Sequence, residues 1–370
     1  MSSYFIGLMS GTSLDGVDGV LVDFSQGTPC VLSHQTLPFD DALKAELMAL
    51  NTAGVNELHR AALAANALVQ VYAQVVTSLL ATTGLTASNI QAIGAHGQTV
   101  RHQPGLFDGV GYTLQLNNPS LLAELAGIAV VADFRSRDVA AGGQGAPLVP
   151  VFHQGVFGKA QQTVAVLNIG GIANVSVLSL QGEVVGFDCG PGNALMDFWC
   201  QHHTGQPYDN NGQWGRSGQV IAPLLQAFMQ EPFLQQAPPK STGRDLFHPA
   251  WLMAHLTRFD QASPADVQAT LTEFTAQACV NDVKRHAPDA CELIVCGGGA
   301  LNGLLMARLQ ACLPASCQVV SSAERGMPPL QVEACAFAWL ARQTVLGLPG
   351  NAPKVTGAKG ARILGGIFPA

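Results

Sequence analysis

The chain has 370 residues, and its 18 Lys and Arg against 25 Asp and Glu give a formal charge of −7. That length allows two domains and a substantial core, and the acidic balance without a basic cluster argues against a nucleic-acid partner. Nine scattered cysteines without a CxxC pair indicate reduced thiols in a cytoplasmic protein. We see no uncharged apolar run of membrane-spanning length, so we expect no membrane partner.

The first predicted element is a β-hairpin whose turn is rich in glycine and hydroxyl side chains. Apolar residues at 4–9 and 17–24 predict its two buried strands. Such a turn presents backbone N–H groups and hydroxyl donors to an anion, and its carboxylates are tolerable beside a phosphate that carries a metal ion. An ordinary hairpin with a polar loop explains the same residues. The candidate segment comprises Ser10, Gly11, Thr12, Ser13, Leu14, Asp15, Gly16, Val17 and Asp18.

Two polar clusters follow later strands of the first half. Apolar residues at three-four spacing predict a long helix over about 56–83. Predicted strands at 90–95 and 128–132 then end in the polar segments 96–102 and 133–138. Ligands of open α/β sheets bind beyond the carboxyl ends of strands, so both segments are candidate site segments, with a loop or helix-cap role as the alternative.

The second half of the chain repeats the opening. After a glycine-rich segment at 140–150, the expected linker or mobile loop, a strand over 163–169 leads through a glycine turn into a second strand. A third strand ends in Asp188, ahead of a Gly-Pro-Gly turn. Duplication of a phosphate-competent hairpin is more informative than either copy, because two such hairpins can hold a polyphosphate from both sides. The second turn contributes Gly170, Gly171 and Asn174.

A third glycine element lies between a predicted strand and the start of a helix, at 296–302. Such a turn brings the backbone close to a ligand at a helix N-terminus, although by itself it fits many proteins. A final apolar helix over 330–345 carries one carboxylate, Glu333, which is also the kind of first-turn acid that the helix dipole favours. The candidate residues of the third element are Gly297, Gly298, Gly299 and Asn302.

Three glycine elements in this order resemble the actin, hexokinase and sugar-kinase superfamily. The resemblance implies an α/β, duplicated ribonuclease-H-like fold of the actin and hexokinase type, with two domains and a cleft between them. It also implies that the two hairpin turns hold phosphates and that the triple glycine contacts adenosine. We expect an N-terminal domain over 1–140, a C-terminal domain over 141–345, and a last segment, 346–370, that packs back on the first.

The sequence of residues 9–18 is a more specific signal, because it resembles a motif of the bacterial anhydro-N-acetylmuramic acid kinase family. That resemblance implies a reaction in which water opens the 1,6-anhydro ring and ATP, with Mg²⁺, phosphorylates the released 6-oxygen of the amino sugar. It also implies a role in cell-wall recycling and a homodimer. Further segments that fit the family are 95–99, 132–135, 168–174, 187–193, 240–244 and 296–302.

The resemblance also suggests roles for single residues. We expect Asp188 to be the general base that takes a proton from the attacking water, with an Asx-type turn residue as the alternative. Residues 11–18 would hold the β- and γ-phosphates, with Asp15 or Asp18 reaching Mg²⁺ mostly through water. No role follows for 240–244. The sugar-binding candidates are His96, Gln98, Thr99, Arg135 (toward the lactyl carboxylate) and Glu333.

Two other functions fit the same pattern. The first is a kinase of another small sugar or carboxylate, because specificity depends on few side chains. The second is a nucleotide-driven binding protein, against which we see neither an appended peptide-binding domain nor a filament-like insertion. A dehydrogenase is excluded, because no G-x-G-x-x-G follows the first strand.

Overall fold

A computed structural model describes residues 3–243 and 246–370. The chain divides into two compact units: unit 1 comprises Met1–Val156 and Gln331–Ala370, and unit 2 comprises Phe157–Leu330. These bounds differ from the expected domains over 1–140 and 141–345. The difference comes from two segments of similar length, 141–156 and 331–345, which both belong to unit 1. The second is almost entirely helix α11 (Val332–Val345), which packs on the sheet of unit 1.

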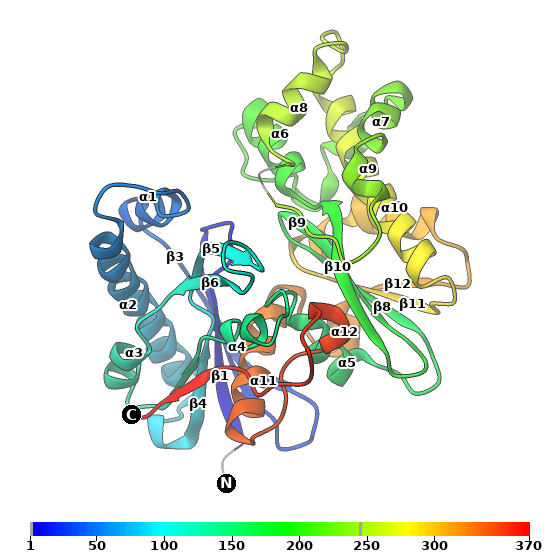
Figure 1. Cartoon of the computed structure of the whole chain (residues 1–370). Coiled ribbons are helices and arrows are strands. Elements are labelled where there is room, and N and C mark those ends of the chain that lie inside the picture. The colour runs from blue at the N-terminus through cyan, green and yellow to red at the C-terminus, as the bar shows by residue number, and fades with distance from the viewer. Residues whose placement is uncertain (1–2, 244–245) are drawn as a thin grey trace. The chain divides into compact units, whose positions relative to one another are not determined.

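The main sheet of unit 1 has the strand order β13-β7-β4-β1-β2-β3. Figure 1 labels β1, β3 and β4 of this sheet. Strands β1 to β3 form an antiparallel meander, and β1, β4 and β7 are parallel neighbours. The last strand of the chain, β13, pairs antiparallel with β7. The strands are β1 (Tyr4–Met9), β2 (Gly16–Asp23), β3 (Cys30–Pro38), β4 (Ile90–Ala95), β7 (Val130–Ala132) and β13 (Gly366–Phe368).

The sheet of unit 2 repeats this topology, with the order β10-β9-β8-β11-β12. Again the first three strands form an antiparallel meander, and the next two add in parallel beside the first. Apart from β13, which has no counterpart in unit 2, the two sheets share one strand order, and this confirms the prediction of a duplicated α/β fold of the actin and hexokinase type. The strands are β8 (Val164–Ile169), β9 (Ile172–Leu178), β10 (Val184–Pro191), β11 (Glu292–Cys296) and β12 (Gln318–Ser321).

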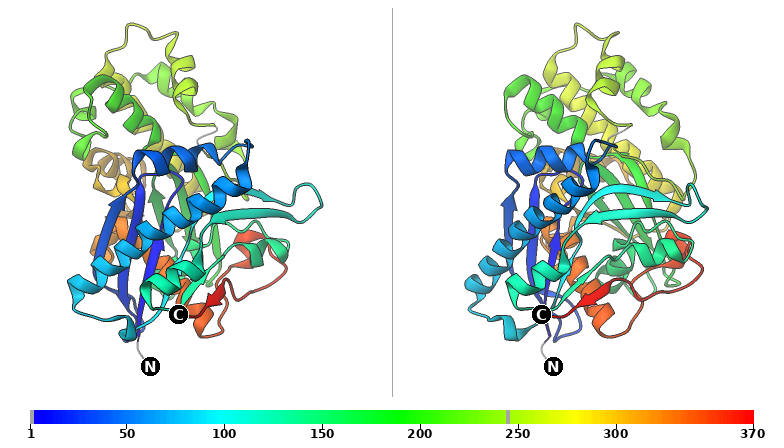
Figure 2. Two further views of the ribbon diagram at one scale, coloured as in Figure 1. Left: turned by 90° about the vertical axis from the view of Figure 1, so that its left-hand side faces the viewer. Right: turned by 60° about the vertical axis from the view of Figure 1, so that its left-hand side comes forward.

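Helix α2 (Glu57–Thr83) lies along the sheet of unit 1 (Figure 2). Its length and mean hydropathy of 1.4 would allow it to cross a membrane, but the core helix of a soluble protein passes the same test. In α2, Leu68, Tyr72, Val76 and Leu79 are wholly or almost wholly buried in the core of unit 1. The three-four spacing that predicted this helix marks the buried face from Ala65 onward, whereas Leu58 and Ala62 at the start of the same pattern are exposed.

Two glycines set how closely α11 approaches the sheet of unit 1. A Cβ atom on Gly7 of β1 would overlap the carbonyl oxygen of Ala334, and one on Gly94 of β4 would overlap that of Phe337. Because glycine has no Cβ, the helix backbone lies directly on the strands. Figure 1 shows α11 in orange beside β1 and β4. This contact places the first turn of α11, with Glu333, at the sheet of unit 1.

The remaining elements of unit 1 surround these layers. The hairpin of β5 and β6 is a separate two-stranded sheet that extends from the unit (Figure 2). These elements are α1 (Asp41–Ala49), β5 (Gln98–Pro104), β6 (Gly111–Leu116), α3 (Pro119–Ala126), α4 (Ser136–Ala140), α5 (Val149–Phe157, which reaches the boundary) and α12 (Pro353–Thr356).

In unit 2 the long helix α9 (Pro264–His286) is buried along most of its length. It packs against β9 and β10 and forms, with the helices around it, one large apolar core that contains Phe228, Phe247 and Phe274. Ser263 caps this helix, because its Oγ accepts a hydrogen bond from Asp266 N at 3.1 Å. The other helices are α6 (Ala194–Thr204), α7 (Ala222–Met229), α8 (Pro249–Leu256) and α10 (Gly303–Cys312).

Candidate functional site

The first glycine turn is anchored by two core side chains. Leu14 N donates to Gly11 O at 3.2 Å and closes the turn, while Leu14 itself has a φ of 59°. The Leu14 and Val17 side chains are buried, so these two predicted residues have only their backbone to offer a ligand. Thr12, in contrast, is exposed at the tip of the turn.

The two carboxylates of this turn lie in different surroundings. Asp18 accepts a hydrogen bond from Thr36 Oγ1 at 2.7 Å and lies 3.4 Å from His34 Nε2. Asp15 is exposed and lies 3.7 Å from Lys44 Nζ. Across residues 3–243 and 246–370 no cluster of three His, Cys, Asp or Glu side chains could hold a metal ion. Mg²⁺ commonly takes one or two carboxylates and completes its shell with waters and substrate phosphates, and the exposed Asp15 fits that pattern.

The segment after β4 is tied directly to the glycine turn. Tyr72, wholly buried in α2, bridges them, because its hydroxyl lies 2.8 Å from Ser10 Oγ and accepts from Gly97 N at 3.1 Å. Gln98 Nε2 donates to Gly11 O at 3.1 Å. Gln98 Oε1 is buried and accepts no hydrogen bond from the described residues, which leaves one acceptor unused beside the turn. Two predicted site segments thus form one structure in unit 1.

His96 and Arg135 form a second polar pair in this unit. His96 Nδ1 lies 3.2 Å from the carbonyl oxygen of Ser10, so Nδ1 carries the proton. Its Nε2 then accepts from Arg135 Nε at 3.1 Å and from Nη2 at 2.9 Å. Burial and the nearby guanidinium lower the pKa of His96 to about 3, so the ring is neutral at physiological pH. A neutral His96 orients Arg135 without opposing its charge.

Arg135 also contacts the glycine-rich segment and the acid of α11. Its Nη1 donates to Gly145 O at 2.8 Å. Burial lowers the pKa of Arg135 to about 10, while the negative charges of Glu333 and Asp138 raise it, so the guanidinium stays charged at neutral pH. The charge of Glu333 at the start of α11 thus acts on Arg135. Arg135 therefore links two of the predicted sugar-binding residues in unit 1, through hydrogen bonds with the neutral His96 and through the charge of Glu333.

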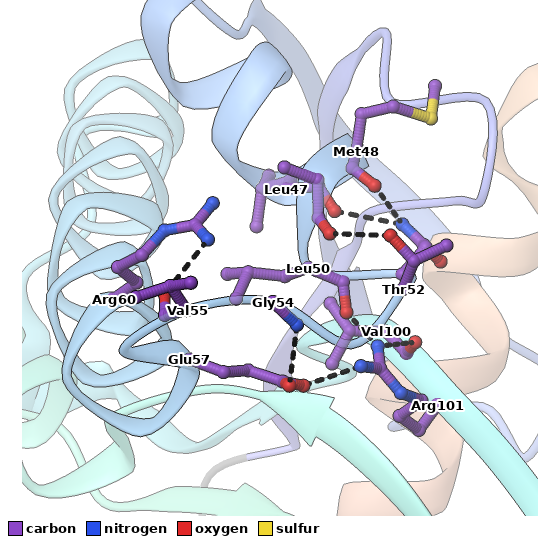
Figure 3. A network of polar contacts seen from close by, with 12 residues as sticks. Leu47, Met48, Leu50, Thr52, Gly54, Val55, Glu57, Arg60, Val100 and Arg101 are labelled. Atoms are coloured by element: carbon purple, nitrogen blue, oxygen red, sulfur yellow. Dashed lines mark hydrogen bonds and ion pairs between the residues drawn. The ribbon is translucent and has the colours of Figure 1, made fainter.

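Thr99 lies at the start of β5, and its hydroxyl accepts a hydrogen bond from Gln115 Nε2 at 3.2 Å. The strand is fixed further along by Arg101, whose guanidinium donates to Leu50 O and to Glu57 Oε1 (Figure 3). Glu57 Oε2 in turn accepts from Gly54 N at 3.3 Å. This network ties the connection between α1 and α2 to β5 and holds the strand that carries Gln98 and Thr99.

In unit 2, Asp188 lies near the end of β10 and is held from a distant segment. Its Oδ2 accepts from Ser241 Oγ at 2.9 Å and from Thr242 N at 3.0 Å, and its own N–H donates to Lys240 O. Burial raises the pKa of Asp188 above its ordinary value, against the lowering effect of these hydrogen bonds and of the Lys240 charge. The hydrogen-bond partners of the carboxylate are thus more than fifty residues away in the sequence. An Asx turn would instead use a main-chain N–H within 188–190.

The second and third glycine elements pack against each other in unit 2. Gly297, with a φ of 75°, has no room for a Cβ atom, which would lie 2.6 Å from Ile169 O. The Gly170 and Gly171 carbonyls accept from Asn193 N at 2.7 Å and Gly192 N at 2.9 Å. Asn174 is the cross-strand partner of Asp188, so the second hairpin and Asp188 are neighbours in the sheet.

Asn302 has a structural role in this arrangement. Its Oδ1 accepts from Leu304 N and Leu305 N, both at 3.1 Å, and so caps α10. Gly298 and Gly299 precede it in a 3₁₀ turn over Gly298–Leu301, and Gly299 is packed against the Ile169 side chain. The side-chain oxygen of Asn302 is therefore used by the fold.

The sequence matches known proteins along its whole length. A family described as anhydro-N-acetylmuramic acid kinase matches residues 3–370. Proteins named anhydro-N-acetylmuramic acid kinase from Variovorax paradoxus (strain S110) and Albidiferax ferrireducens are 64% and 60% identical, over 99% and 100% of both chains. One of that name from Bordetella pertussis is 55% identical over 99% of this chain and 96% of its own. This chain belongs to the anhydro-N-acetylmuramic acid kinase family. The family predicted from the motif at 9–18 is confirmed.

Several polar residues of this anhydro-N-acetylmuramic acid kinase family member have roles that were not predicted from the sequence. Ser241 and Thr242 lie in a segment that fitted the family without a role, and Arg244 of that segment is outside the described residues. Asp138 was named only within a polar cluster, yet it is wholly buried and accepts from Gly145 N at 2.8 Å. Its Oδ1 accepts from two side chains of the C-terminal segment, Asn351 Nδ2 at 2.6 Å and Thr356 Oγ1 at 2.8 Å.

Proposed function

We propose that this chain is an ATP-dependent kinase that opens the ring of 1,6-anhydro-N-acetylmuramic acid and phosphorylates its 6-oxygen. Water forms a bond to the anomeric carbon, the bond from that carbon to the 6-oxygen breaks, and the 6-oxygen takes the γ-phosphoryl group of ATP. The products are N-acetylmuramic acid 6-phosphate and ADP, which places the reaction in peptidoglycan recycling. The full-length match to the family carries the proposal.

Asp188 is the general base of this mechanism. It takes the proton of the attacking water, for which its carboxylate must be ionised. Burial raises its pKa, which makes the ionised carboxylate a better proton acceptor than an exposed aspartate. The hydrogen bonds from Ser241 and Thr242 both fall on Oδ2 and hold the group in one orientation.

The residues 11–18 hold the β- and γ-phosphates of ATP, and the glycine elements of unit 2 provide the second phosphate turn and the adenosine contacts. Phosphoryl transfer depends mainly on positioning and charge neutralisation. When bound, Mg²⁺ neutralises phosphate charge, and Asp15 and Asp18 would hold it mostly through water. In unit 2, Gly170, Gly171, Asn174 and Gly297–Gly299 line the packed turns that we assign to the nucleotide.

Gly11→Ala is expected to raise KM for ATP about 10–100-fold, because a methyl group blocks one or two phosphate contacts worth about 1.5–3 kcal/mol. The thermal midpoint should stay the same, since a Cβ atom there lies no closer than 3.7 Å to any atom of the fold. Gly155→Ala, at an exposed helix position with open space, is the matched control. An unchanged KM for ATP would refute the phosphate assignment.

The amino sugar is bound by His96, Gln98, Thr99, Arg135 and Glu333 of unit 1. Arg135 has five N–H donors, and its three contacting nitrogens leave N–H groups for the lactyl carboxylate. The unused Gln98 Oε1 is an acceptor for a sugar hydroxyl or amide. Glu333 accepts a hydroxyl or holds the attacking water.

The substrate is tested by coupled ADP release with anhydro-N-acetylmuramic acid, N-acetylmuramic acid and N-acetylglucosamine. We expect turnover with the anhydro sugar alone and a 6-phosphate product. Turnover on an open-ring sugar would favour the kinase of another sugar and remove the hydrolytic step. Slow ATP turnover that no sugar changes would favour a nucleotide-driven binding protein.

We propose in addition that the enzyme is a cytoplasmic homodimer. The free cysteines, most of them buried, fit a reducing compartment. Sedimentation equilibrium of the purified chain tests the dimer, and a monomer at micromolar concentration would contradict it.

A further inference from the structure

The segment 240–242 contributes Lys240 to a buried ion pair for which the mechanism above has no use. The Lys240 side chain is fully buried, and its Nζ donates to Asp282 Oδ2 of α9 at 2.8 Å. Nζ also lies 5.0 Å from the centroid of the Phe233 ring and 5.6 Å from that of Phe187. A lysine with no exposed surface is thus held by one carboxylate and two aromatic rings.

Stability alone is a poor explanation for such a pair. The free energy needed to remove two charges from water is about as large as the free energy gained from their attraction. Proteins with an apolar pair of similar volume in place of a buried ion pair are often equally stable. The surroundings of Lys240 suggest a local purpose. Its carbonyl oxygen accepts from Asp188 N at 3.2 Å, and the next two residues, Ser241 and Thr242, donate to Asp188 Oδ2. The segment 240–242 therefore contacts both the main-chain N–H and the carboxylate of Asp188.

Both donors fall on the same oxygen of Asp188. Within the described part of the chain no hydrogen bond reaches Oδ1, so Oδ1 is the oxygen that can take a proton from a ligand. The position of the segment 240–242 therefore determines which carboxylate oxygen of Asp188 is left to take the proton. Ser241 is exposed and Thr242 only partly buried, so burial of their own side chains does not fix the segment. The buried residue of the segment is Lys240.

We propose that Lys240 is a positioning residue for Asp188: its buried ion pair with Asp282 anchors the segment 240–242, which holds Asp188 Oδ2 and presents Oδ1 for the proton. This inference rests on the proposed role of Asp188 as the base. It gives the segment at 240–242 a function in the same step of the reaction.

The charges around Asp188 give this arrangement a measurable signature. The groups that bear on the Asp188 carboxylate are the Ser241 hydroxyl, the Thr242 N–H and the Lys240 ammonium, and all three lower its pKa. On α9, Asp282 and His286 interact electrostatically with Lys240, and Arg285 interacts with both of them. Loss of the Lys240 charge and of its anchor therefore raises the pKa of Asp188, and the acid limb of kcat moves to higher pH.

The test is the double variant Lys240→Met/Asp282→Leu, which replaces the pair by apolar side chains. We expect kcat to fall at least about tenfold, the acid limb to move to higher pH, and KM for ATP to stay the same. Ser241→Ala, at an exposed position, should move the acid limb in the same direction without changing the thermal midpoint. The matched control is Glu273→Leu/Arg308→Met, which removes another ion pair of α9 and should leave the pH profile unchanged.

A folded double variant with the parental kcat and pH profile would overturn the proposal. Should that variant not fold, Lys240→Gln decides, because it keeps a donor for Asp282 and removes the charge; an unchanged profile would again overturn it. Asp188→Asn is measured in parallel. If Asp188→Asn keeps its turnover, the base itself is wrong, whereas loss of turnover there with normal Lys240 variants refutes the positioning role alone.

Discussion

Asp188→Asn is expected to lower kcat for the anhydro sugar by about 10²–10⁴-fold, the usual contribution of a positioned general base. The amide keeps the size of the carboxylate and an oxygen that can accept from Ser241 and Thr242. The thermal midpoint and the KM for ATP should therefore stay near those of the parent. Steady-state kinetics and a thermal melt measure all three.

The control for this variant is Asp260→Asn, which removes an exposed carboxylate of the same unit. It should leave kcat unchanged. The parental enzyme should also lose kcat as the pH falls through the pKa of Asp188, because protonation removes the base; burial places that loss at higher pH than for an exposed aspartate. Retention of more than about a tenth of kcat in Asp188→Asn would contradict the assignment.

Gly7→Ala is expected to lower the free energy of unfolding by about 3 kcal/mol or more, at the upper end of the usual cost of overpacking. The added methyl group would meet the backbone of α11 at Ala334 and Ala338, which has no flexible end that could move aside. The helix must shift, and Glu333 in its first turn shifts with it. We therefore expect loss of kcat in the fraction that still folds. Chemical denaturation measures the stability.

Gly366→Ala is the matched control, because it is a strand glycine of the same sheet whose Cβ atom would lie no closer than 3.7 Å to its neighbours. It should change the free energy of unfolding by less than about 1 kcal/mol. Equal stabilities of Gly7→Ala and the parent would show that the contact between α11 and β1 is looser than described.

The local pattern of the sequence predicts much of this fold. The three-four spacing at 58–79 identifies α2, and alternating apolar runs around the glycine turns identify both hairpins and their duplication. It also predicts that 96–102 and 133–138 follow strands, and the structure joins them through the contact of His96 with Arg135. These features depend on neighbours within one element or on one rule of sheet topology, so a single sequence contains them.

Contacts between distant segments were not predictable in the same way. Nothing in the sequence at 240–242 indicates a hydrogen bond to Asp188. Likewise, no periodicity shows that α11 packs on β1 and β4 at Gly7 and Gly94. The helix cap formed by Asn302 is a further case, because its position after a triple glycine suggested a ligand contact and not that its Oδ1 caps α10; the ligand contact itself stays a prediction. Specific pairings of this kind depend on where the chain returns in space, which a local pattern does not encode.

Unit 1 contains both ends of the chain, with unit 2 inserted between them. On the ribosome, β1 and β4 therefore emerge long before α11, which covers them, and before Asn351 and Thr356, which bind Asp138. Translation of the roughly 170 residues of unit 2 alone takes about 9–35 s. During that time the sheet face at Gly7 and Gly94 lacks its helix, whereas the whole of unit 2 has been synthesised before α11 is made.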